Sequence, residues 1–125
     1  MDGFDIISNY TFNDAKIINF KERPELEGKN LTYSPKHSVS SSIIWNNKVL
    51  NTSLKCLYKS KQYGDDANEN ILDGYFTIDL MLSKPIKDHL IISLDIEDML
   101  NNRHMATINY ISPGRLINGR IAFQF

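Results

Sequence analysis

The residues with the clearest chemical potential are three oxygen-bearing side chains at alternate positions in one polar stretch. Asp66, Asn68 and Asn70 have the spacing of the first ligands in a calcium-binding loop, where carboxylate and amide oxygens coordinate the ion. An EF-hand would also need glycine at Ile71 and a bidentate glutamate at Thr77. Because neither position fits, we interpret this stretch as a polar loop, with a looser cation site as the alternative.

Paired carboxylates are the second candidate for chemistry. Asp95 and Glu97 alternate along one segment, so they lie on the same face if that segment is a strand, and such a pair could support acid–base catalysis. The inner wall of a membrane β-barrel is polar in any case, and such a wall explains the pair without catalysis. We therefore favour a structural role for both residues.

The remaining reactive side chains are scattered. His37, His89 and His104 lie in or beside three different connections, without a cysteine or a second histidine at metal-ligand spacing. Cys56 is the single cysteine and falls on an apolar face, which favours a small packed residue over a reactive thiol. No nucleophile elbow accompanies the serines. We predict no catalytic, cofactor-binding or metal-ligating residue, and hence no enzyme and no cofactor.

The segments that carry these side chains have the period of β-strands. At the end of the chain, Ile117, Gly119, Ile121, Phe123 and Phe125 form one face, and the residues between them are mostly polar. A soluble protein rarely finishes on an apolar strand, because termini fray unless they are tied down. A transmembrane β-barrel places lipid against one face of such a strand and a wet lumen against the other.

Six alternating segments can be read along the chain, and their connections alternate between long and short. Asn46–Asn47 is expected to form a two-residue turn, and Pro85–His89 a second short turn in which Pro85 ends its strand. Each segment has roughly the 9–11 residues that cross a bilayer when tilted. We predict an all-β fold, an antiparallel meander of about six strands that forms part of a transmembrane β-barrel. The expected strands are about Phe4–Ile17, His37–Trp45, Lys48–Tyr63, Gly74–Lys84, Leu90–Asp98 and Arg115–Phe125.

Composition narrows the class further. The chain has 125 residues, enough for one domain, and its 14 basic and 15 acidic residues leave no basic excess that would attract nucleic acid. A mean hydropathy of −0.33 and the lack of an apolar run near twenty residues exclude a transmembrane helix. The acidic start, Met1–Asp5, is not a secretory signal.

Eight short segments of the chain form a recognisable series. They are Asn9–Lys16, Gly28–Lys29, Pro35–Ser38, Tyr63–Asn68, Gly74–Leu80, Ile96–Arg103, Pro113–Arg115 and the terminal aromatic Phe125. In their order and spacing, these segments resemble the C-terminal part of TonB-dependent outer-membrane receptors. Two positions depart from the family pattern: Asp98 stands where asparagine is usual, and His104 stands where an aromatic residue is common. Arg115 either holds the extracellular rim or touches ligand, and we favour the structural role.

The resemblance implies a barrel of about 22 strands around a plug domain, in the cell outer membrane. Such receptors bind an iron–siderophore complex or a cobalamin-type ligand outside and import it with energy passed on by TonB. Residues 1–125 would be the C-terminal barrel segment, with plug, TonB box and signal peptide absent. Its partners would be the remaining barrel and plug, TonB through the missing N-terminal part, the ligand and outer-membrane lipid.

Six strands alone would leave two unpaired edges, so this segment is not expected to transport anything by itself. The rival interpretation is a small soluble β-barrel that binds an apolar ligand inside, with its apolar side chains turned inward. Alternation does not distinguish the two, because it does not say which face is outside.

A row of charges is expected on the polar face. If the turn at Pro85–His89 places Lys84 opposite Leu90, then Asp79 lies opposite Asp95. The five charged residues of the row occupy the polar register of their strands and should share one face. They are Lys55, Asp79, Asp95, Glu97 and Arg120, with Lys55 facing Asp79 and Arg120 facing Asp95 or Glu97.

Overall fold

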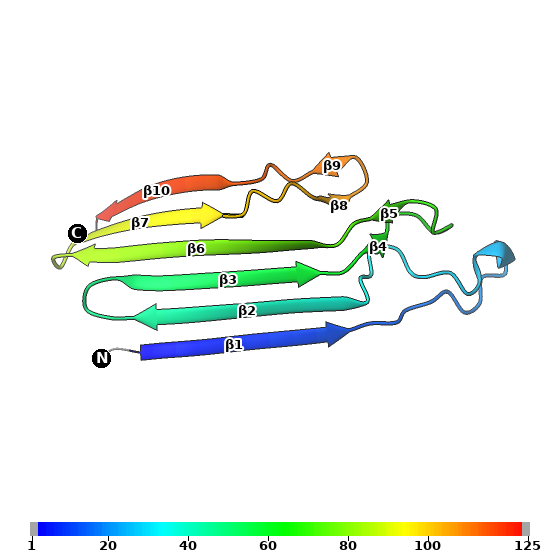
Figure 1. Ribbon diagram of the computed structural model, residues 1–125, viewed down its shortest axis with the longest axis horizontal. Coiled ribbons are helices and arrows are strands. Elements are labelled where there is room, and N and C mark those ends of the chain that lie inside the picture. The colour runs from blue at the N-terminus through cyan, green and yellow to red at the C-terminus, as the bar shows by residue number, and fades with distance from the viewer. Residues whose placement is uncertain (1–2, 124–125) are drawn as a thin grey trace.

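In a computed structural model, which describes residues 3–123, the chain forms one long antiparallel sheet (Figure 1). The six strands follow the order β1-β2-β3-β6-β7-β10, so each long strand pairs with the next long strand along the chain. This confirms the predicted all-β meander. The strands are β1 (Gly3–Phe12), β2 (His37–Asn46), β3 (Asn51–Lys59), β6 (Tyr75–Ile86), β7 (Leu90–Glu97) and β10 (Leu116–Phe123).

The short elements gather at one end of the sheet, where the three long connections run (Figure 1). The opposite end carries the two short turns, together with the start of β1 and the end of β10. The short elements are a 3₁₀ helix, η1 (Pro24–Leu26), and the strands β4 (Gln62–Tyr63), β5 (Ile71–Leu72), β8 (Met105–Thr107) and β9 (Tyr110–Ile111). Residues 3–123 include no helix that is long and apolar enough to cross a membrane.

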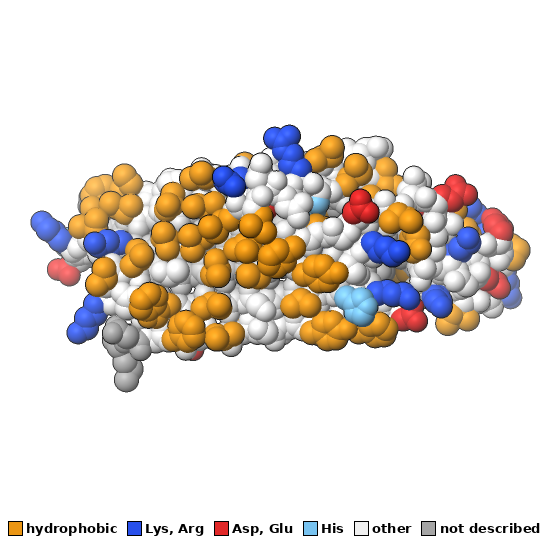
Figure 2. Space-filling view, viewed as in Figure 1, with side chains coloured by type: hydrophobic (Ala, Val, Ile, Leu, Met, Phe, Trp, Pro, Cys, Tyr) orange, Lys and Arg blue, Asp and Glu red, His pale blue; other side chains and the backbone are white. Residues whose placement is uncertain are grey.

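One face of the sheet is apolar across its whole width. The strand registers align an aliphatic row that crosses all six strands, and side chains in directly opposed positions share a face. Figure 2 shows this face, with apolar side chains over most of the long strands. The row consists of Ile6, Ile43, Leu54, Leu80, Ile96 and Ile117.

The sheet is a single layer, and nothing in residues 3–123 covers its apolar face. Ile6 is 61% exposed and Ile117 is 63% exposed, although both lie in the aliphatic row. The buried apolar side chains in this part of the chain are Leu26 and Leu72, which both belong to the loop end. The sheet therefore has no hydrophobic core of its own, and its apolar face must be covered by something else.

Two predicted strands are shorter than expected. β1 ends at Phe12 instead of Ile17, because beyond it the chain pairs only at separate points, such as the bridge between Lys16 and Asn30. β3 ends at Lys59, and Gln62–Tyr63 forms a separate small pair with β5. The predicted end of β10 at Phe125 lies outside the described residues.

The first short turn is longer than predicted. Trp45 pairs with Thr52, so the turn occupies residues 47–50, and the two-residue turn at Asn46–Asn47 is wrong. The Asn47 side chain explains the difference. Its Oδ1 accepts hydrogen bonds from the backbone N–H of Val49 at 2.8 Å and of Leu50 at 2.9 Å, which stabilises a wider asparagine turn.

Pro85 does not end its strand, which contradicts the second predicted turn. β6 continues to Ile86, and Ile86 rather than Lys84 faces Leu90. Proline is tolerated there because β3 pairs with β6 only as far as Ser83, so Pro85 has a neighbouring strand on one side only. The register of this hairpin is therefore shifted by two residues, a shift that leaves every side chain on its predicted face.

We expect the chain on its own to aggregate in plain buffer and to become monodisperse only in detergent. The physical reason is that it combines an uncovered apolar face with open backbone edges on β1 and β10. Size-exclusion chromatography with light scattering, in buffer and in maltoside detergent, measures this. A monodisperse water-soluble monomer would contradict the expectation.

Candidate functional site

The polar face carries the predicted charge row, in a different register from the one expected. Lys55 lies opposite Asp79, as predicted. Asp79 does not lie opposite Asp95, however, because the shift at Pro85 places Met81 there. Arg120 faces Ser93, two positions from the partner of Asp95, so it flanks that acid instead of opposing it. All five charged residues share the polar face, as the alternation predicted.

Hydrogen bonding, rather than ion pairing, dominates this acidic region. Among residues 3–123 the ion pairs are Arg23–Glu25 and Lys36–Asp14, so Lys55 and Asp79 face each other without forming one. Asp79 Oδ1 instead accepts the backbone N–H of Asp98 at 2.9 Å, at the point where β7 ends. This contact anchors the start of the last long connection to β6.

Two carboxylates near this contact lack partners within the described residues. Both oxygens of Asp98 are buried without a hydrogen bond, and so is Oδ1 of Asp95. A hollow of about 290 Å³ is lined by Asp95, but not by Asp98; Lys55, Asp79 and Glu97 also belong to its wall. With three carboxylates against one ammonium group, the wall is suited to a partner that offers positive charge or hydrogen-bond donors.

A second polar cluster lies at the loop end, around His104. The His104 ring stacks on Tyr75, the first residue of β6, with ring centroids 3.7 Å apart and an interplanar angle of 15°. The ring nitrogen Nδ1 of His104 lies 2.9 Å from the backbone carbonyl oxygen of Asn102. The backbone N–H of His104 donates a hydrogen bond to Ser112 Oγ at 3.1 Å. The side-chain amide of Asn102 donates a hydrogen bond to the Phe76 backbone carbonyl at 3.0 Å. The connection from β7 to β10, which carries β8 and β9, is therefore fixed to β6.

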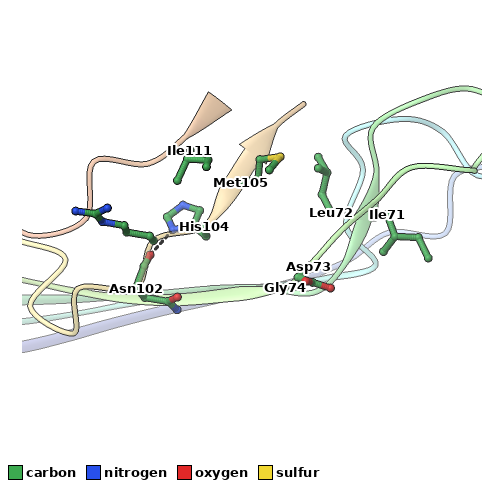
Figure 3. A pocket seen from close by; sticks show the side chains of 9 residues that line it. Ile71, Leu72, Asp73, Gly74, Asn102, His104, Met105 and Ile111 are labelled. Carbon is green, nitrogen blue, oxygen red and sulfur yellow. Dashed lines mark hydrogen bonds between the residues drawn. The ribbon is translucent and has the colours of Figure 1, made fainter. Parts of the chain in front are cut away.

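This cluster borders a pocket of about 390 Å³ between β5 and the β8–β9 hairpin (Figure 3). Asp73, Asn102, Arg103 and His104 supply charged and polar groups to its wall. The apolar part of the lining comes from Ile71, Leu72, Met105 and Ile111. Such a mixture suits an organic ligand that has both a flat apolar part and polar substituents.

Arg115 has the structural contacts that the sequence favoured. Its Nε and one terminal nitrogen donate to the Met99 carbonyl at 3.1 and 2.6 Å, and its backbone N–H donates to Asn101 Oδ1 at 3.1 Å. Gly114 makes room for this arrangement, because it has φ +80° and a Cβ there would approach Asn101 Oδ1 to 2.5 Å. The Pro-Gly-Arg segment thus fastens the start of β10 to the end of β7.

Of the three side chains with calcium-like spacing, Asn68 is engaged in hydrogen bonds, mainly with another loop. The Asn68 side chain accepts the N–H of Asn30 at 2.7 Å and donates to its carbonyl at 2.9 Å. Asp65 accepts the backbone N–H groups of Glu69 and Asn70. Within residues 3–123 no group of three His, Cys, Asp or Glu residues is arranged to hold a metal ion.

The three histidines lie in different parts of the structure and have different neighbours. His37 contacts Tyr10 and Phe12 on the apolar face, whereas His104 stacks on Tyr75. His89 belongs to the short turn after β6. Cys56 lies on the apolar face, where Ser41 and Ile78 are its cross-strand neighbours, so it packs as a small side chain.

One acid of the loop end has a shifted pKa. The pKa of Glu25 lies below its ordinary value, first because its carboxylate accepts a backbone hydrogen bond from its own residue and second because Arg23 donates to it at 3.1 Å. Glu25 is fully exposed, so this pair orders the surface of η1 and contributes little to stability.

Sequence reasoning did not find the stacking of His104 on Tyr75. Tyr75 begins β6, whereas His104 lies in the connection after β7, and no local spacing links them. The available signal was that Tyr75 lies in one segment of the family resemblance, Gly74–Leu80, and that His104 directly follows another, Ile96–Arg103. The register pairs the two segments where Leu80 meets Ile96.

The fold and its two polar clusters define a segment of barrel wall, with one apolar face, one polar face and an elaborate loop end. A family model described as TonB dependent receptor-like, beta-barrel matches residues 2–99. The chain belongs to this family of TonB-dependent receptors. No match was found among curated protein sequences.

Solved structures share the fold at low sequence identity. BauA, the ferric preacinetobactin receptor from Acinetobacter baumannii, is 19% identical with a TM-score of 0.83, and the match covers 98% of this chain and 20% of that chain. Fiu, the ferric-catecholate import receptor from E. coli, is 18% identical with a TM-score of 0.81, covering 98% and 19%. PiuA, a siderophore receptor from A. baumannii, is 16% identical with a TM-score of 0.74, covering 96% and 18%. This chain therefore spans about a fifth of each of these structures.

We expect His104→Ala to loosen the connection from β7 to β10, which carries β8 and β9, without unfolding the sheet. Loss of one aromatic stack and one or two hydrogen bonds should lower the local opening free energy by about 1–2 kcal/mol. Hydrogen exchange in residues 103–112, measured by mass spectrometry in detergent, should then be roughly 5–30 times faster. His89→Ala, in the short turn, is the matched control and should leave that exchange unchanged. Equal exchange in both variants would show that the stack does not hold the connection.

Proposed function

We propose that this chain is a C-terminal part of the barrel wall of an outer-membrane receptor that imports an iron–siderophore complex. The observation that carries the proposal is the separation of the two faces by register. An aliphatic row crosses all six strands on one face, and the charge row lies on the other. Lipid suits the first face and a wet lumen suits the second.

The rest of the barrel and a plug domain are the partners that the sheet requires. β1 and β10 each have an unpaired edge within the described residues, and a membrane does not tolerate open edges. Each solved relative is about five times as long as this chain, which leaves room for the missing strands and plug. Energy transfer from TonB would reach the receptor through that remaining part, and this segment alone would not transport.

An iron–siderophore complex is preferred over a cobalamin-type ligand. Three of the solved relatives are described as receptors for ferric preacinetobactin, ferric catecholate and ferric yersiniabactin. The loop-end pocket, with Arg103 and His104 beside apolar side chains, offers positive and stacking groups to an anionic, partly aromatic iron complex. No step of this proposed function requires catalysis by the chain.

The rival function, a small soluble barrel around an apolar ligand, is disfavoured by the topology. Such a barrel needs β1 and β10 to pair and so to close the sheet, but these strands stand at opposite ends of the strand order. It also needs apolar side chains packed inside, whereas most of the large apolar side chains on the sheet are exposed.

Two adjacent serines test which face contacts lipid. Ser41 lies mid-strand on the apolar face, and Ser40 is next to it on the polar face. We expect Ser41→Arg to cost about 2–4 kcal/mol of unfolding free energy in phospholipid vesicles, and Ser40→Arg to cost little. Urea unfolding of the complete receptor that contains this segment, followed by circular dichroism of its β-sheet, measures both variants. Equal costs, or a larger cost for Ser40→Arg, would contradict the proposed orientation.

Ligand class is tested on the complete receptor that contains this segment. Purified in detergent, that receptor should bind a ferric catecholate siderophore at least tenfold more tightly than cobalamin, as measured by quenching of its tryptophan fluorescence. The iron-free siderophore is the control and should bind more weakly, because the metal fixes the shape of the complex. Preference for cobalamin would overturn the ligand assignment and leave the barrel assignment intact.

A further inference from the structure

A pocket of about 400 Å³ opens where β1, β2 and β3 reach the loop end, and it is separate from the pocket beside His104. Its lining includes Lys36, His37, Ser60 and Lys61. None of the residues that line it is acidic. The pocket is therefore a place of positive charge at the edge of the long strands.

The two lysines keep most of their charge available. Lys36 approaches Asp14 at 3.6 Å, but both side chains remain about half exposed, so this pair is weak. Lys61 is exposed and forms no ion pair with the part of the chain that the structure describes. An anion entering the pocket could contact both ammonium groups.

His37 connects this pocket to the apolar face. Its ring stacks on Tyr10 with centroids 6.1 Å apart and lies against Phe12 at 5.4 Å. The Tyr10 hydroxyl and His37 Nδ1 are 2.9 Å apart, whereas Nε2 has no hydrogen bond within the described residues. Both aromatic rings point away from the sheet on its apolar side, and each is more than half exposed.

The charged and apolar features form one continuous surface. Figure 2 shows a histidine with basic side chains beside it, at the point where the apolar band ends toward the loops. From this point toward the turn end of the sheet, the apolar band continues through Val39 and Tyr58, which pair with each other across β2 and β3. A molecule that fits the whole surface would have an anionic head and long apolar chains.

We propose that this pocket binds the phosphorylated headgroup of a membrane lipid, whose acyl chains lie on the band formed by Tyr10, Phe12 and their neighbours. The proposal rests on the membrane placement of the apolar face. Basic side chains just beyond an apolar band attract anionic lipid headgroups, and the amphipathic rings of His37 and Tyr10 suit the boundary between the two. A soluble anion would use the lysines but would leave the neighbouring rings uncovered.

The test uses the complete receptor that contains this segment, in maltoside micelles that contain phosphatidic acid, phosphatidylcholine or neither. Native mass spectrometry counts the lipid molecules that remain bound after the micelle is removed, and circular dichroism checks that the sheet is formed. We expect at least fivefold more phosphatidic acid than phosphatidylcholine to remain bound. The double variant Lys36→Gln/Lys61→Gln should lose this preference, and Lys36→Arg/Lys61→Arg should keep it.

The control variant Lys48→Gln/Lys87→Gln removes the same charge from exposed positions in the short turns and should bind phosphatidic acid like the unsubstituted chain. Equal retention of the two lipids, or loss of preference in this control, would overturn the lipid site and leave the receptor assignment intact. Full competition by glycerol 3-phosphate would instead identify a site for soluble anions.

Discussion

The pairing of backbone N–H and C=O groups between neighbouring strands is the constraint on which this structure depends. At membrane depth there is no water to satisfy these groups, so every strand must be flanked by another strand. The ladder from β1 to β10 meets this need for four of the six strands on both sides. Within the described residues, the two outer strands each leave one edge open, so the sheet does not close on itself.

The same pairing decides where each side chain points. Because directly opposed residues share a face, a single register aligns Ile6 with Ile117 through four intervening aliphatic side chains. A slip of one residue in any pair would carry the remaining strands to the wrong face. A slip of two would not, and this is why the shift at Pro85 moves Asp79 away from Asp95 without disturbing either face.

Alternation was therefore enough to predict the six long strands and their two faces, including the common face of Lys55, Asp79 and Arg120, but not where β1 and β3 end. The sheet order followed from alternation together with the short connections. Alternation was not enough to predict the turns. The turn at residues 47–50 depends on two backbone hydrogen bonds that one asparagine side chain accepts, and the extension of β6 depends on where its pairing with β3 stops. Both are properties of neighbours in space. The stack of His104 on Tyr75 belongs to the same class, since the contact exists only after β6 and β7 have paired.

The two ends of the sheet differ in the length of their connections and in what those connections hold. The turn end closes its strands with few residues, whereas the loop end holds the buried Leu26 and Leu72, the pocket beside His104 and the pocket beside His37. Fixed contacts, such as those from Arg115 to Met99 and from Asp98 to Asp79, join these loops to the strand ends. The polar groups of the loop end are thus held on the strand ladder, and the exposed apolar side chains of the sheet can change in kind without moving them. This separation explains how relatives that are less than 20% identical keep the same wall.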